Sequence, residues 1–114
     1  MDQTKDIGMR LSELRDACIG EAKRLQIEGR TDETAFARVE ANVYDAFSQV
    51  WNAACKHRGA DAMEFFLQKL TDIPQAWVRA KAEAEAHGDS KKAFVEDIKL
   101  RAVKTIRAEI GAMV

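Results

Sequence analysis

A few glutamates, histidines and cysteines are the residues of this sequence that could support catalysis or bind a metal. Metal centres in helical bundles use glutamates on several helices, together with Glu-x-x-His pairs that place two ligands on one helical face. Three glutamates fall within apolar stretches, namely Glu21, Glu40 and Glu109. None of them has a histidine three positions later. The sequence therefore predicts no metal site and no metal cofactor.

The histidines and cysteines do not form a catalytic pattern. His57 and His87 stand immediately before or close to a glycine, where we expect helices to end. A protonated imidazole in the last turn interacts favourably with the helix dipole, so a capping role is expected for both. Cys18 and Cys55 are 37 positions apart and form no CxxC pair, so both are expected to be reduced, small, buried side chains. We predict neither enzymatic activity nor a cofactor.

One acidic residue is unusual because it shares a helical face with aromatic residues. Spacings of three and four place four residues on this face: Glu40, Tyr44, Phe47 and Trp51. A buried carboxylate must be paired, hydrogen-bonded or neutral. One interpretation is a structural one, in which Glu40 pairs with Arg10 or Arg15 or accepts a hydrogen bond from a tyrosine. The other is a small-molecule pocket lined by these four residues, with Glu40 as its polar anchor.

The last predicted helix is locally basic. It carries six cations against three acids: Lys91, Lys92, Lys99, Arg101, Lys104 and Arg107 against Glu96, Asp97 and Glu109. Contacts with nucleic-acid phosphates use such side chains, but here acids intervene and the aromatic residues lie elsewhere in the chain. A solvated helix face is the expected role, and weak nucleic-acid association through this helix is an alternative.

Composition indicates the class of protein to which these side chains belong. The chain has 114 residues, 46% of them hydrophobic and 32% charged, with a single proline and a net charge of -1. We expect one domain over residues 1–114 with enough apolar surface for a folded core. The near-neutral charge argues against a dedicated nucleic-acid binder. No targeting segment and no apolar run of membrane-spanning length is visible, so a cytoplasmic protein without membrane association is expected.

Helical periodicity and regularly placed glycines predict an all-α fold. Apolar residues recur at steps of three and four in five segments, which are 4–28, 32–58, 62–70, 74–87 and 91–112. Gly29, Gly59, Gly88 and Pro74 mark the breaks between them. Short loops imply antiparallel neighbours, so we expect a small bundle of three long helices, with the two short helices forming a crossover between the second and the fifth.

The same periodicity identifies the core and the helix caps. The predicted core consists of Leu11, Leu14, Cys18, Leu25, Phe36, Val43, Phe47, Val50, Phe66, Leu70, Trp77, Ile98, Ala102 and Ile106. Leu67 is placed on the buried side of the third helix as well. Thr31 or Asp32 is expected to cap the second helix, and Asp89 or Ser90 the fifth. Asp61 with Glu64 resembles a capping box at the start of the third.

Four large apolar residues fall outside the predicted stripes: Met9, Ile27, Phe65 and Leu100. Apolar side chains on surfaces that a monomer leaves wet indicate further packing, within the fold or between subunits. We therefore expect a non-enzymatic helical protein that acts by protein–protein contact, as a homodimer or an adaptor. A small-molecule-responsive domain and weak nucleic-acid association are the alternatives.

Overall fold

The computed structural model describes the backbone of residues 3–113 and the side chains of residues 6–112, and over this range it is all-α. The α-helices, joined by short turns and a 3₁₀ turn at Gly59–Asp61, are α1 (Gln3–Ile27), α2 (Thr31–Arg58), α3 (Ala62–Asp72), α4 (Pro74–Ala86) and α5 (Ser90–Met113). The all-α prediction is confirmed, and each predicted helix has its counterpart within about two residues at either end.

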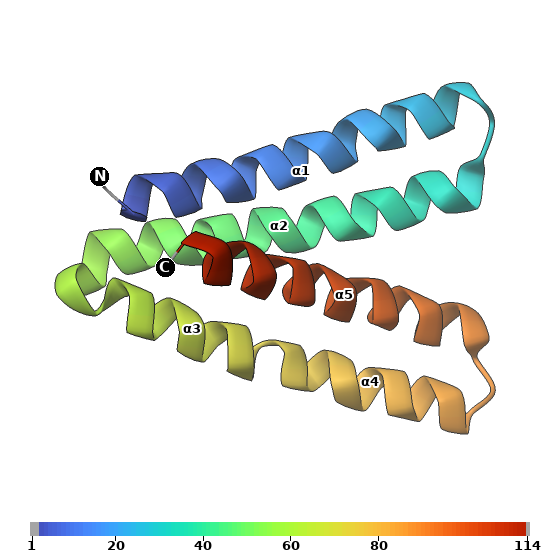
Figure 1. Cartoon of the computed structure of the whole chain (residues 1–114). Helices are drawn as coiled ribbons and strands as arrows, with labels where there is room; N and C mark the ends of the chain where they lie inside the picture. The colour runs from blue at the N-terminus through green and yellow to red at the C-terminus, as the bar shows by residue number, and fades with distance from the viewer. Residues whose placement is uncertain (1–2, 114) are drawn as a thin grey trace.

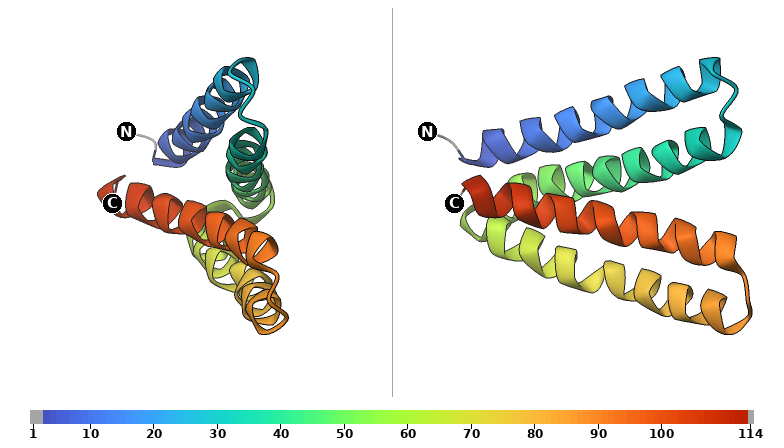
Figure 2. Two further views of the ribbon diagram at one scale, coloured as in Figure 1. Left: turned by 90° about the vertical axis from the view of Figure 1, so that its right-hand side faces the viewer. Right: turned by 45° about the vertical axis from the view of Figure 1, so that its right-hand side comes forward.

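The helices form four antiparallel arms, of which α3 and α4 together make the third (Figure 1). The two short helices connect α2 to α5, and they do so as one bent arm that runs back along the bundle. Consequently α2 and α5 point the same way. The radius of gyration is 15.3 Å, compared with about 13 Å for a compact domain of this length. The difference reflects arms that diverge at the end holding the α1–α2 and α4–α5 turns (Figure 2).

Glycines with left-handed backbones end two of the arms. Gly29 has φ +76° and Gly88 has φ +73°, a region that residues with a Cβ rarely adopt. After each glycine the backbone N–H reaches back five residues, from Arg30 to Leu25 O at 3.0 Å and from Asp89 to Ala84 O at 2.8 Å. This six-to-one hydrogen bond defines the Schellman motif, which satisfies carbonyls at the helix end. The predicted breaks at Gly29 and Gly88 are thus confirmed.

The predicted caps were only partly correct. The Asp89 carboxylate accepts a hydrogen bond from the Lys92 backbone N–H at 3.1 Å, as an N-cap should. The capping box predicted at Asp61 is wrong, because the Asp61 side chain makes no capping hydrogen bond. Helix α2 begins at Thr31 after Arg30, whose side chain does not cap it either. The prediction that Thr31 or Asp32 caps α2 is therefore wrong, because both residues lie within the helix. Before α3 the chain instead forms the 3₁₀ turn at Gly59–Asp61.

The third arm bends where Pro74 interrupts the helical hydrogen bonds. Ile73 keeps helical angles and its N–H still bonds to Lys69 O at 3.0 Å. Pro74 has no N–H, so the Leu70 carbonyl loses its intrahelical partner. Arg107 of α5 takes that place, with its Nη2 donating to Leu70 O at 2.9 Å. The bend and its contact with α5 therefore share one physical cause.

The core lies at the closed end of the bundle, where α1 begins and α2 and α5 end (Figure 1). The largest fully buried side chains are Ile7, Tyr44, Phe47, Phe66, Leu70 and Ile106. Phe66 contacts both Phe47 and Trp51 edge to face, with ring centroids 6.1 and 5.2 Å apart. All fourteen predicted core residues are buried or half-buried. Leu67 is the correction, because 41% of it is exposed.

Candidate functional site

Glu40 belongs to a polar cluster that joins three helices. Its carboxylate accepts a hydrogen bond from the Tyr44 hydroxyl at 2.8 Å, one helical turn away on α2. The Cys18 thiol of α1 lies close enough to this carboxylate, and Thr105 of α5 close enough to the Tyr44 hydroxyl, to influence the pKa of the thiol and of the hydroxyl. Glu40 is half-buried and Tyr44 is fully buried. The predicted hydrogen bond to a tyrosine is confirmed, whereas the burial of Glu40 is only partial.

Electrostatics in this cluster favour protonated neighbours of the carboxylate. Burial and the Glu40 carboxylate raise the pKa of the Cys18 thiol to about 12. The same two causes, burial first, raise the pKa of the Tyr44 hydroxyl well above its ordinary range. The reactive form of cysteine is the thiolate, so Cys18 is held in its unreactive form. The chemistry of the cluster is therefore hydrogen bonding rather than nucleophilic attack.

The aromatic residues predicted to line a pocket beside Glu40 lie inside the core. Tyr44 and Phe47 are each 1% exposed, and Trp51 is 3% exposed. Trp51 also packs over Gly8, where an added Cβ would lie 3.5 Å from the indole Cδ1. A ligand could contact these rings only if helices separated. The small-molecule hypothesis thus stays a prediction that requires a conformational change.

The arginines suggested as partners of Glu40 pair elsewhere. Arg10 makes a bidentate contact with Glu109 of α5, with both N–O distances 2.8 Å. Arg15 Nη1 lies 3.2 Å from the Asp45 carboxylate of α2. These two pairs lie on opposite flanks of α1, so Arg10 marks the side that faces α5 and Arg15 the side turned away from it.

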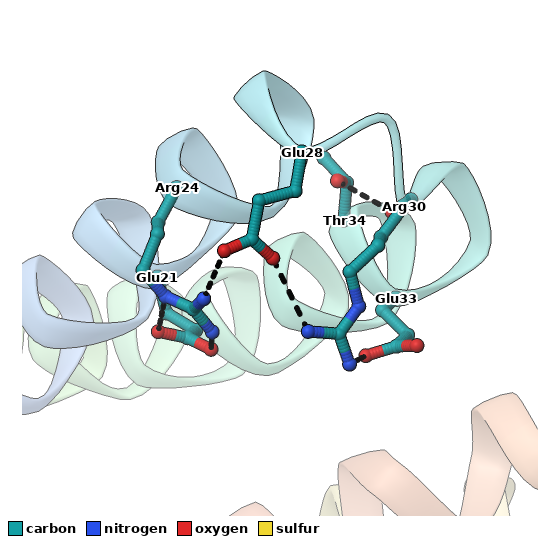
Figure 3. A network of polar contacts seen from close by, with 6 residues as sticks. All are labelled: Glu21, Arg24, Glu28, Arg30, Glu33 and Thr34. Atoms are coloured by element: carbon teal, nitrogen blue, oxygen red, sulfur yellow. Dashed lines mark hydrogen bonds and ion pairs between the residues drawn. The ribbon is translucent and has the colours of Figure 1, made fainter.

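A network of charged side chains surrounds the α1–α2 turn (Figure 3). Arg24 bridges Glu21 and Glu28, and Arg30 bridges Glu28 and Glu33. All five side chains are roughly half exposed, so each pair contributes little to stability. Of the three glutamates considered as metal ligands, Glu21 and Glu109 thus pair with arginine. No group of three or more metal-ligating side chains occurs within the part of the chain that is described.

Several cations of the basic C-terminal helix have partners within the fold. Lys99 Nζ lies 3.2 Å from Glu96 and stacks over the Trp77 ring at 5.7 Å. Arg101 pairs with Asp97 at 3.0 Å, and Arg107 bonds to the Leu70 carbonyl. These contacts reduce the positive charge that α5 presents to an outside partner.

Glu96 is buried, which the sequence analysis did not anticipate. Its exposure is 6%, and its second carboxylate oxygen has no hydrogen-bond partner in residues 6–112. It shares a helical face with Ala93, Leu100 and Val103, of which Ala93 and Val103 are buried and Leu100 is half-buried. The spacing of these three apolar residues marks a second stripe on α5, and this signal would have placed Glu96 inside.

The four predicted interface residues are not gathered in one patch. Met9 is 53% exposed and Ile27 is 87% exposed, but they lie 18 residues apart on α1, about 27 Å along the helix. Phe65 and Leu100 are half-buried, and Phe65 lies beneath Arg58, whose guanidinium is 5.0 Å from the ring centroid. Sequence reasoning missed four further exposed residues: Ile19, Leu67, Val78 and Phe94.

A hollow lies between α1 and α2 on the flank of α1 that is turned away from α5. We call this hollow the outer groove. Its main part, of about 600 Å³, is lined by Arg15, Ile19, Ala22, Lys23, Arg38, Ala41, Asn42 and Asp45. A second hollow of about 350 Å³ adjoins it through Arg38 and continues to Gly29 and Thr31. The walls carry three cations and one carboxylate, and Ala22 and Ala41 form a buried, apolar floor.

Comparisons with protein-family models, with curated proteins and with solved structures each find no match to this chain. Within the described part of the chain, each helix is too short or too polar to cross a membrane.

Proposed function

We propose that this protein acts by protein–protein contact, as a homodimer or an adaptor, and carries out no chemistry of its own in the cytoplasm. The observation that carries the proposal is the exposure of large apolar side chains on a well-packed bundle. Ile27 is 87% exposed, and Met9, Val78 and Phe94 are each about half exposed. Burying one such side chain contributes about 1.5–3 kcal/mol, so several of them would offset much of the cost of association.

The polar chemistry of the chain supports the same proposal. The Cys18 thiol is held protonated, and the Glu40 carboxylate accepts a hydrogen bond from the Tyr44 hydroxyl. Neither arrangement resembles an activated nucleophile, which needs a lowered pKa or an adjacent general base.

Light scattering coupled to size exclusion tests this proposal, together with capture from the native cell followed by native mass spectrometry. We expect a mass above 12.8 kDa at micromolar concentration, or a partner held in fixed stoichiometry. If a different protein is the partner and binds these exposed apolar side chains, Met9→Asp and Ile27→Asp should weaken its binding without loss of helicity, since both side chains are exposed. A monomer that retains no partner in fixed stoichiometry would refute the proposal.

A further inference from the structure

We infer that the outer groove binds helix α4 of a second copy of this chain. The inference rests on the proposed function, because it specifies the partner and the surface of a protein–protein contact. Four features support it: the charges on the groove walls, the charges on α4, their spacing along the two helices, and the length of both elements.

The groove presents two cations at one level on opposite walls. The contact between Arg15 and Asp45 shows the register of antiparallel α1 and α2 at this point, so residues whose numbers sum to about 60 lie level. Lys23 of α1 and Arg38 of α2 meet this condition and face each other across the groove. Arg38 donates to the Gln26 amide at 3.0 Å. In residues 6–112 neither cation has a carboxylate within ion-pair distance, whereas Arg15 has two.

Helix α4 presents the complementary charges. Trp77 and Ala84 face the rest of the fold, and Ala82 and Ala86 are on the opposite, exposed side. At 100° per residue, Glu83 and Glu85 fall on the two flanks of this exposed side. A helix lying in the groove on its alanine side would therefore direct one carboxylate to each wall. Small side chains allow that close approach, because the groove floor is itself formed by alanine.

The spacing along the two elements agrees as well. The groove carries its one carboxylate, Asp45, seven residues from Arg38, which is about 10 Å. On α4 the single exposed cation, Arg79, precedes Glu85 by six residues, or about 9 Å. If α4 runs antiparallel to α2, the alignment that brings Glu83 and Glu85 to the two groove cations also brings Arg79 to Asp45. The groove from Thr31 to Asp45 spans about 21 Å, and the 13 residues of α4 span about 20 Å.

Charge reversal on each surface, followed by mixing, tests the inference. The groove variant carries Lys23→Glu and Arg38→Glu, and the α4 variant carries Glu83→Lys and Glu85→Lys. We expect the parent to associate at micromolar concentration in 50 mM salt, and each variant alone to associate at least tenfold more weakly. An equimolar mixture should regain the parent affinity, because in the mixed pair both groove–α4 contacts again join opposite charges. Circular dichroism confirms that each variant is folded.

Two further measurements keep the test decisive. A control with Lys56→Glu and Lys92→Glu, both exposed and outside the groove, should associate as the parent does. Raising salt to 500 mM should weaken association of the parent itself, since exposed charge pairs are screened. Association that is unchanged in both variants would overturn the α4 contact and leave the proposed function standing. A parent that stays monomeric would overturn the contact, and capture of a different partner would then still support the adaptor role.

Discussion

At the scale of single residues, the hydrogen bond between Tyr44 and Glu40 joins a buried core residue to a half-buried carboxylate. Tyr44 is 1% exposed, so its hydroxyl depends on partners within the fold, of which the Glu40 carboxylate at 2.8 Å is one. A buried donor left unsatisfied costs about 1–3 kcal/mol. The half-buried position of Glu40 keeps part of its own hydration, which is why the pair does not carry the full cost of a buried charge.

We expect Tyr44→Phe to lower the free energy of unfolding by about 1–2 kcal/mol, because it removes the hydroxyl and keeps the ring volume. Glu40→Gln should cost less, since the amide oxygen still accepts from Tyr44. Urea denaturation of both variants beside the parent measures the difference. Equal stability of Tyr44→Phe and the parent would mean that the hydrogen bond contributes nothing to the fold.

The raised pKa of Cys18 predicts how stability depends on pH. The folded state holds the thiol protonated up to about pH 12, whereas the unfolded chain releases the proton near its ordinary value of 9.0. Above that value the folded state binds more protons, so stability falls as pH rises. Urea unfolding at pH 7.5, 9 and 10 should give a declining free energy for the parent and a shallower decline for Cys18→Ala. An identical slope in the variant would contradict this assignment.

At the scale of elements, the bend of the third arm links Pro74 to α5 through one carbonyl. Arg107→Met should lower the free energy of unfolding by about 1 kcal/mol, because Leu70 O then loses its donor. Pro74→Ala restores a backbone N–H that can reach the same carbonyl. A double-mutant cycle by denaturant unfolding should therefore show a smaller cost of Arg107→Met in the Pro74→Ala background. Additive effects would indicate that Arg107 does not replace the missing hydrogen bond.

Sequence patterns predicted the helices well because their signals are local. Gly29, Gly88 and Pro74 end helices through their own backbone preferences, so the breaks followed from residue type alone. Faces that depend on a neighbouring helix were harder to predict. Leu67 is exposed because it lies outside the side of α3 that packs on α2, and Glu96 is buried because α4 packs against α5.

The candidate sites also differ in whether the signal lies within one helix or depends on a neighbouring helix. The Tyr44–Glu40 contact joins residues four apart on one helix, so helical spacing was enough to suggest it. The outer groove combines residues of α1 and α2, and only the register in which these two helices pack brings Lys23 level with Arg38. Single-helix patterns carry no information about such a register.

At the scale of the whole molecule, packing is unequal between the two ends of the bundle. Large side chains of α1, α2, α3 and α5 fill the closed end, whereas the arms diverge at the other end (Figure 2). Helix α4 has only Pro74 and Ala84 buried, and its first contact across the bundle is the half-buried Trp77, 6.4 Å from Phe47 between ring centroids. Local opening costs least where few apolar contacts must break.

Hydrogen exchange separates this packing effect from intrinsic helix propensity. The alanine-rich segment 80–86 has the higher propensity, so propensity alone predicts slow exchange there. We expect the opposite in 500 mM salt at low protein concentration: amides of 78–86 should exchange at least tenfold faster than those of 43–54, which adjoin Phe47, Trp51 and Ala54 in the core. Equal protection of the two segments would contradict unequal packing.

At high protein concentration and low salt, docking of α4 in a second copy should slow exchange in 78–86, and the Glu83→Lys, Glu85→Lys variant should lose that protection.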